Sequence, residues 1–111
     1  MKTVNLEAGM PFADQAIRRL TYELNCARQL KTPGFKIIHG YGSSGTGGVL
    51  RQRLRAYLAR QKAAGKVRMV IEGERLSIFD AETRDAFAYC PDLRSDRDLE
   101  RHNNGITVII L

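Results

Sequence analysis

The sequence of 111 residues contains no tryptophan, two cysteines and two histidines. Cys26 and Cys90 are too few for a disulfide framework, and with two histidines beside them they do not match a structural zinc site. No apolar run approaches the roughly 20 residues of a membrane-spanning helix, and the first residues show no apolar signal core. We therefore expect reduced thiols, a cytoplasmic location and no membrane partner.

Acidic residues are missing from one long stretch of the chain. Residues 18–68 carry twelve lysines and arginines but a single acid, Glu23, and no aspartate or glutamate occurs between Leu24 and Ile71. Charges of opposite sign normally interleave on a solvated face. With a net charge of +6, the stretch predicts a surface that meets an anionic partner, most commonly nucleic acid. The alternative is a basic face that serves solubility alone.

The length and the hydrophobic pattern predict one domain over residues 1–111, with a single core. The pattern is that of strands over 3–7, 35–39, 67–71 and 106–111, and of amphipathic helices over 12–30 and 49–63. A less regular region follows the third strand: 75–79 is strand or loop, Asp80 caps a short helix up to 89, and 91–105 is a polar loop. Strands that alternate with helices indicate an α/β fold, with a mixed or parallel sheet and helices packed on it.

Two segments carry further expectations about charge and burial. In the second long helix the predicted buried stripe is Val49, Leu50, Leu54, Tyr57 and Leu58, and the bases predicted to fall largely on the other side are Arg51, Arg55 and Lys62. In the polar loop, Asp96, Asp98 and Glu100 alternate with Arg97 and Arg101. This alternation predicts a solvated loop with local ion pairs rather than a metal-binding acid cluster.

Glycine is concentrated in one place. Five glycines fall within residues 40–48, between a predicted strand and a predicted helix. Glycine lets the backbone approach a ligand closely, and a helix N-terminus offers free N–H groups to an anion. The predicted phosphate-binding residues are Gly40, Tyr41, Gly42, Ser43, Ser44, Gly45, Thr46, Gly47, Gly48, Arg51, Arg53 and Arg55. The alternative is a turn that binds no ligand.

Two familiar phosphate motifs fit this turn poorly. A Walker A loop ends in Gly-Lys-Ser/Thr, whereas Gly47 is followed by Gly48 and Val49. The spacing of Gly40, Gly42 and Gly45 matches the dinucleotide-binding pattern, but that fold places an acid about 20 residues further on to hold the ribose. Here the first acid after the turn is Glu72. Neither an NTPase nor a dinucleotide-binding fold is therefore favoured.

The segment resembles the Smr domain family, whose motif is a strand ending in His-Gly-x-Gly, a glycine-rich turn and a helix that opens like Gly-x-Leu-Arg. The matching residues are His39-Gly40-Tyr41-Gly42 and Gly48-Val49-Leu50-Arg51, and the chain end Gly105-Ile106-Thr107-Val108-Ile109-Ile110-Leu111 is similar to the family's last strand. The resemblance covers most of the chain. It implies a two-layer β-α-β-α-β-β sandwich with a mixed four-stranded sheet, like the C-terminal domain of translation initiation factor three. It also implies binding of DNA or RNA and, in some members, nicking or endonuclease activity.

The first strand departs from the family pattern. The family opens with Leu-Asp-Leu-His-Gly, whose Asp and His are implicated in cleavage, and the matching stretch is Val4-Asn5-Leu6-Glu7. Asn5 cannot act as a base, whereas Glu7 can take a proton or bind a metal. His39, with a reference pKa of about 6.5, can serve as general acid or base. Alternatively, it makes a structural hydrogen bond that holds the turn.

These features predict a nucleic-acid-binding domain that holds a DNA or RNA backbone at the glycine-rich turn and the basic helix. Binding itself would need no cofactor. A metal-assisted endonuclease would use His39 and Glu7 with Mg²⁺ or Mn²⁺, at a site that the sequence does not indicate. A different class of function is a non-catalytic adaptor that binds a protein or a small phosphate ligand through the same turn.

Overall fold

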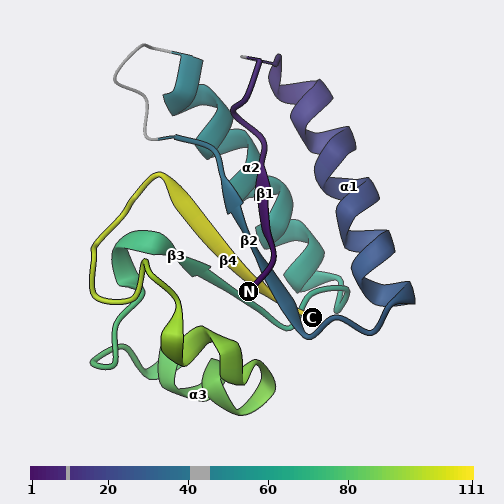
Figure 1. Ribbon diagram of the computed structural model, residues 1–111. Helices are drawn as coiled ribbons and strands as arrows, with labels where there is room; N and C mark the ends of the chain where they lie inside the picture. Colours follow the sequence, from purple (N-terminus) through teal and green to yellow (C-terminus); the bar gives the residue numbers. More distant parts are fainter. Residues whose placement is uncertain (10, 41–45) are drawn as a thin grey trace.

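The computed structural model describes residues 1–9, 11–40 and 46–111. Its elements are β1 (Thr3–Asn5), α1 (Ala13–Gln29), β2 (Gly34–Ile38), α2 (Thr46–Ala63), β3 (Met69–Glu72), α3 (Ala81–Tyr89) and β4 (Ile106–Ile110). Short 3₁₀ helices lie at Gly73–Arg75 and Pro91–Ser95. All the predicted strands and helices are present, with ends that differ by up to three residues (Figure 1).

The four strands form one mixed sheet in the order β1-β2-β4-β3. β1 is parallel to β2, and β4 runs antiparallel to both β2 and β3. The carboxyl ends of β1, β2 and β3 therefore meet the start of β4 at one end of the sheet, which we call the carboxyl edge. The opposite end, where β1, β2 and β3 begin and β4 ends, is the amino edge.

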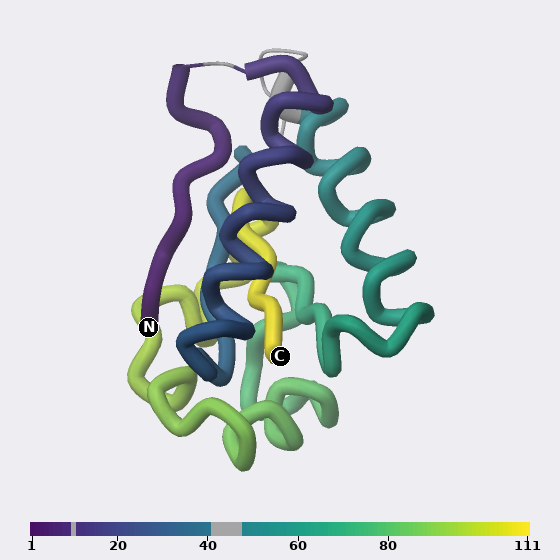
Figure 2. Tube along the Cα trace, turned by 90° about the vertical axis from the view of Figure 1, so that its right-hand side faces the viewer, coloured from purple at the N-terminus to yellow at the C-terminus, as the bar shows by residue number. Residues whose placement is uncertain are grey.

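Helices cover both faces of the sheet. α1 and α2 lie side by side on one face (Figure 2), joined by a 2.7 Å hydrogen bond between Thr21 and Tyr57. Their shared core with the sheet includes Leu20, Leu24, Leu54, Leu58, Phe35 and Ile37. On the other face, α3 and its neighbours bury Ile71, Leu76, Phe87, Leu93, Val108 and Ile110. The predicted fold class is confirmed, and α3 adds cover on the second face.

β4 is one of the two inner strands of the sheet and is buried along its whole length. Ile109 faces the core under α1 and α2, whereas Ile106, Val108 and Ile110 face the core under α3. Such burial on both faces explains the almost continuous apolar run in the sequence. Thr107 interrupts that run, and its side chain is also fully buried.

Local signals fix the helix ends. At the start of α1, the backbone N–H of Phe12 donates to the side chain of Gln15 at 3.1 Å, one half of a capping box. The side chain of Asp80 accepts the N–H of Thr83 at 3.0 Å, so the predicted cap of α3 is confirmed. α1 ends just before Lys31, which has a left-handed φ of 56°.

Two predictions about burial are wrong. Val49 does not belong to the buried stripe of α2, because 53% of it is exposed. Arg55 does not lie on the solvent side of the helix; it is turned toward the end of the sheet, and its side chain is 16% exposed. The buried positions are Leu50, Leu54 and Leu58, spaced by one helical turn, and this narrower stripe leaves Arg55 at its border.

The prediction of a solvated acidic loop is also wrong. Lys36 projects from the α3 side of β2 and is 3% exposed. Its Nζ donates to Asp96 at 3.0 Å and to Asp98 at 2.6 Å, and Asn103 donates to the second oxygen of Asp98 at 3.1 Å. A buried lysine needs such partners, so the two acids are paired with β2 and not with neighbouring arginines.

Cys26 and Cys90 are both free thiols, and Cys90 is buried. Among residues 1–9, 11–40 and 46–111, the structure contains no helix with the length and apolar character needed to cross a membrane.

Candidate nucleic-acid interface

The carboxyl edge brings together the two residues predicted to take part in cleavage. Glu7 follows β1 and His39 follows β2, and the parallel pairing places these strand ends side by side. The side chain of Asn5 accepts the N–H groups of Glu7 and Ala8 at 2.9 and 3.0 Å, which turns the chain at the end of β1. Asn5 therefore has a local structural role that an aspartate would also perform.

Gly40 is required at this edge for two reasons. Its φ of 75° lies in the left-handed region, which side-chain-bearing residues rarely adopt. A Cβ at this position would lie 3.1 Å from Cδ of Glu7 and closer still to one of its carboxylate oxygens. The carboxylate of the exposed Glu7 thus lies directly over the backbone of Gly40.

The ring of His39 is fully buried. Nδ1 lies 2.7 Å from the carbonyl oxygen of Gly40, which can only accept, so Nδ1 carries the proton. Nε2 then accepts a hydrogen bond from the hydroxyl of Thr107 at 2.8 Å. Burial is the main cause that lowers the pKa of His39 to about 4; the Gly40 carbonyl opposes this shift, and Arg55 and Arg51 add to it. The imidazole is therefore neutral near pH 7.

The backbone around His39 is held as firmly as its ring. The N–H groups of His39 and Gly40 both donate to the carbonyl oxygen of Gly105, at 3.0 and 3.1 Å. These hydrogen bonds and those of the ring give His39 the structural role that the sequence analysis offered as the alternative. They fix the direction in which the chain enters the glycine-rich segment. To act as an acid or base, His39 would first have to exchange one of its two ring partners, so its role in cleavage stays a prediction.

Arg55 has no hydrogen-bond donor left for a ligand. Nε donates to Thr107 at 3.0 Å, one terminal nitrogen donates to Glu72 and Glu74, and the other donates to Glu74 and to the carbonyl oxygen of Ile106. A guanidinium has five N–H groups, and all five are used here. In the structure Arg55 joins α2 to β3 and β4, and its predicted phosphate contact stays a prediction.

The other predicted binding residues differ in how far they are exposed and free to contact a ligand. Arg53 pairs with Asp14 at 2.8 Å, but both side chains are more than half exposed, and such pairs contribute at most about 1 kcal/mol. Arg51 is half-buried. Thr46, Gly47 and Gly48 form the start of α2, where the first backbone N–H groups of a helix have no intrahelical acceptor. Tyr41, Gly42, Ser43, Ser44 and Gly45 lie outside the described residues.

Charge at the carboxyl edge is balanced rather than basic. Three of the arginines of α2, Arg51, Arg53 and Arg55, are accompanied by the acids Glu7, Asp14, Glu72 and Glu74. An anion at this edge would therefore be held by the helix N-terminus and the backbone more than by net positive charge.

Several residues of this site were not identified from the sequence: Glu72, Glu74, Gly105 and Thr107. Thr107 carried a usable signal, because a hydroxyl inside a strand buried on both faces needs a hydrogen-bond partner. Nothing in the sequence indicated that Glu72 and Glu74 pair with Arg55, because they lie 17 and 19 residues from it along the chain.

The residues at this edge do not match a protein-ligated metal centre. In the described part of the chain, no three His, Cys, Asp or Glu side chains are close enough together to hold a metal ion. Glu7 is the exposed carboxylate nearest to Gly40, and alone it is a weak ligand set for Mg²⁺ or Mn²⁺.

Comparisons with known proteins agree with this fold. The family model of the Smr domain matches residues 9–75, which run from the turn after β1 to the first 3₁₀ helix. The crystal structure of the Smr domain of Thermus thermophilus MutS2 is similar, with a TM-score of 0.63 and 22% identity over 100% of this chain and 98% of that one. No curated protein matches the chain.

Proposed function

The chain belongs to the Smr domain family, and we propose that it binds DNA or RNA through the phosphate backbone at the carboxyl edge. The observation that carries this proposal is that α2 begins at Thr46, six residues after the left-handed Gly40, which lies where β1 and β2 end. A helix N-terminus combines free N–H groups with a partial positive charge, and both favour a phosphate.

The surrounding contacts support a rigid platform for such a ligand. Gly105 holds the backbone of His39 and Gly40, and Arg55 holds α2 against β3 and β4. A site that is fixed before binding loses less conformational entropy when the ligand arrives. Arg53 can exchange its exposed partner Asp14 for a phosphate at little cost, and Arg51 lies one turn before Arg55 on the same helix.

Binding is tested with the double variant Arg51→Ala and Arg53→Ala, measured by fluorescence anisotropy on labelled DNA and RNA of one strand or two. We expect a loss of affinity of about thirtyfold or more, because two charge-assisted contacts that are each worth more than about 1 kcal/mol sum to more than about 2 kcal/mol. The matched control is Arg97→Ala with Arg101→Ala, which removes the same charge from the exposed loop before β4. Equal affinity of the two double variants would place the contact elsewhere.

Cleavage is a second candidate function, favoured by the exposed carboxylate of Glu7 over Gly40. Phosphodiester hydrolysis needs a proton acceptor for the attacking group, and Glu7 is an exposed acid whose carboxylate lies next to Gly40. The test is a denaturing gel after incubation with Mg²⁺ or Mn²⁺, comparing the wild type with Glu7→Gln. New bands that disappear in Glu7→Gln support cleavage, and bands that persist assign it to another group. An adaptor would instead bind free phosphate or a protein but no oligonucleotide.

A further inference from the structure

The twelve bases of residues 18–68 differ in whether they are paired with an acid in the structure. Five of the twelve are paired with acids from other parts of the chain or the same helix: Arg19, Lys36, Arg53, Arg55 and Lys62. In the part of the chain that the structure describes, the other seven have no acidic partner within 4.0 Å: Arg18, Arg28, Lys31, Arg51, Arg60, Lys66 and Arg68. The sequence alone therefore does not show that some bases of α2 are paired with acids, or where in the structure the bases without acidic partners lie.

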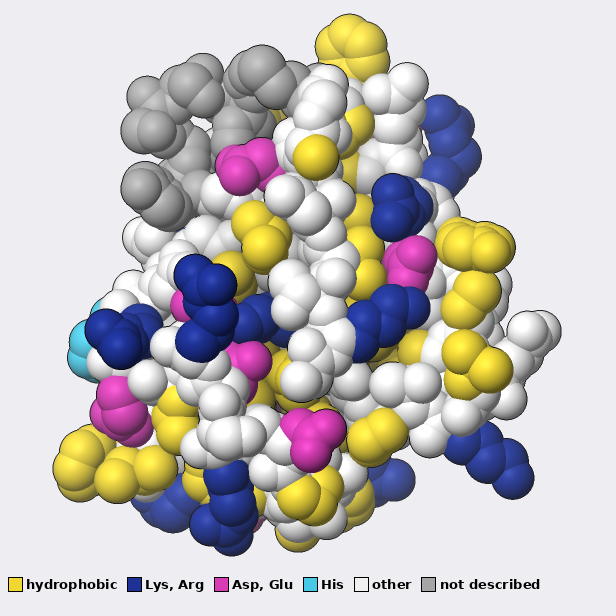
Figure 3. All heavy atoms as spheres, in the orientation of Figure 1, with side chains coloured by type: hydrophobic (Ala, Val, Ile, Leu, Met, Phe, Trp, Pro, Cys, Tyr) yellow, Lys and Arg dark blue, Asp and Glu magenta, His cyan; other side chains and the backbone are white. Residues whose placement is uncertain are grey.

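Five of these seven bases gather at the amino edge, opposite the glycine-rich turn. They are Arg28, Lys31, Arg60, Lys66 and Arg68, all exposed, and we call them the amino-edge basic surface. Both long helices end here (Figure 1), and Figure 3 shows basic side chains protruding at the lower right of the molecule.

Backbone contacts hold this surface together. Arg28 donates to the carbonyl oxygen of Lys66 at 2.8 Å, which joins the end of α1 to the turn after α2. The N–H of Arg68 donates to Ile110 at 2.8 Å, which fixes the same turn to the end of β4. The side chains of Lys31 and Lys66 have no hydrogen bond to any described residue and remain available to a ligand.

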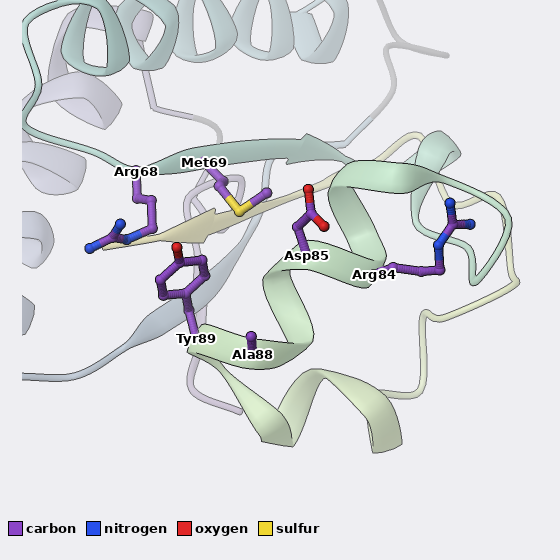
Figure 4. Close-up of a pocket in the computed structure, with 6 residues that line it drawn as sticks. All are labelled: Arg68, Met69, Arg84, Asp85, Ala88 and Tyr89. Carbon is purple, nitrogen blue, oxygen red and sulfur yellow. The ribbon is translucent and has the colours of Figure 1, made fainter.

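An aromatic side chain borders the surface. The guanidinium of Arg68 lies 4.2 Å from the ring centre of Tyr89, which is 47% exposed. The two residues form one end of a shallow hollow between β3 and α3, which Asp85 and Arg84 also line (Figure 4). Paired arginine and tyrosine planes suit a nucleobase or a sugar next to a bound phosphate.

Helix dipoles explain only part of this arrangement. Bases near a helix C-terminus offset its partial negative charge, and this accounts for Arg28 and Arg60 in the last turns of α1 and α2. Lys66 and Arg68 lie beyond the end of α2 at Ala63, and Lys31 lies beyond the end of α1. Three of the five bases therefore need another explanation.

We propose that the amino-edge basic surface is a second contact for the backbone of DNA or RNA, separate from the carboxyl edge. This inference rests on the proposed function. α2 has 18 residues and spans about 27 Å between the two edges at about 1.5 Å per residue. Because a strand advances about 3.4 Å per nucleotide, an oligonucleotide must have about eight nucleotides or more to contact both edges.

The test uses the full chain with Lys31→Glu and Lys66→Glu together, two exposed side chains without described partners. The matched control is Arg97→Glu with Arg101→Glu, which changes the net charge by the same amount at exposed sites elsewhere. Binding of labelled 20-nucleotide DNA and RNA, single and double stranded, is followed by anisotropy across a salt series. Thermal unfolding confirms that each variant is folded, and Lys31→Gln with Lys66→Gln replaces the first variant if it is not.

We expect the amino-edge variant to lose at least tenfold in affinity while the control loses less than twofold. The slope of log affinity against log salt should shrink by about 1.5, since each lost phosphate contact removes about 0.7 to 0.9 from it. A five-nucleotide oligomer is too short to contact both edges at once. The wild type should therefore bind it no more tightly than the amino-edge variant does. Equal affinities of the two variants would overturn the inference while the proposed function stands, whereas a wild type that binds no oligonucleotide would overturn both.

Discussion

The hydroxyl of Thr107 links His39 to Arg55. Its oxygen accepts a hydrogen bond from Nε of Arg55 at 3.0 Å and donates to Nε2 of His39 at 2.8 Å. One side chain on an inner strand thus connects the turn after β2 with α2 and, through Arg55, with Glu72 at the end of β3 and Glu74 just after it. The carboxyl edge is a single hydrogen-bonded unit that holds the entrance to the glycine-rich segment.

Thr107→Val removes this hydroxyl and keeps the shape of the side chain. Nε2 of His39 would be left buried without a donor, and Nε of Arg55 would lose its acceptor. We expect a loss of about 1–3 kcal/mol in the free energy of unfolding, as for other buried groups left unsatisfied, measured by urea denaturation. Thr3→Val is the matched control on the exposed face of β1 and should change stability by less than about 0.5 kcal/mol.

Acid should destabilise the protein through His39. The folded-state pKa of about 4 lies below the ordinary value of 6.5, so the unfolded chain binds a proton that the folded chain does not. The stability from neutral His39 is fully present above about pH 6.5 and declines as the pH falls toward 4, by roughly 3 kcal/mol in total. Urea denaturation between pH 7 and 5 measures this slope.

The control for this pH dependence is the second histidine. His102→Gln alters an exposed residue and should leave the slope between pH 7 and 5 in place. His39→Gln removes the titrating group and should flatten the slope while lowering stability overall. A slope that persists in His39→Gln would assign the acid sensitivity to other groups.

Alanine substitutions at Gly40 and Gly65 can distinguish the stability cost of a left-handed backbone from the cost of a side-chain contact. Their φ angles are 75° and 76°, but only a Cβ on Gly40 would meet Glu7, whereas none lies within 4 Å at Gly65. Gly65→Ala should cost about 1–2 kcal/mol from the left-handed backbone alone, and Gly40→Ala should cost more. Adding Glu7→Ala to Gly40→Ala should recover the excess, and no recovery would mean that Glu7 is not the obstacle.

Arg55 and Arg53 should behave in opposite ways. Arg55→Ala leaves Thr107, Glu72 and Glu74 without their donor, and we expect a loss of about 2 kcal/mol in stability, because the two acids are partly exposed and screened. Arg53→Ala should change stability by less than about 1 kcal/mol and weaken nucleic-acid binding instead. The reverse pattern would contradict the roles that the structure assigns to them.

The sequence was sufficient for the parts of the fold that depend on local patterns. The hydrophobic pattern predicted a strand over 106–111, and Asp80 predicted the start of α3. Charge pairing could not be predicted in the same way. Arg55 and Lys36 find their acids only after the strands pair, because the partners of Lys36 lie 60 and 62 residues away along the chain. The basic stretch therefore predicts an anionic partner, which stays a prediction, but it does not reveal which of its bases are paired with acids in the structure.

The central claim is that the protein binds nucleic acid through its phosphate backbone. The most direct measurement is the affinity of the wild type for labelled DNA and RNA, by anisotropy, from low to high salt. We expect the logarithm of the affinity to fall linearly with the logarithm of the salt concentration, because bound counterions are released. An affinity that does not change with salt, or no binding at any salt, would contradict it.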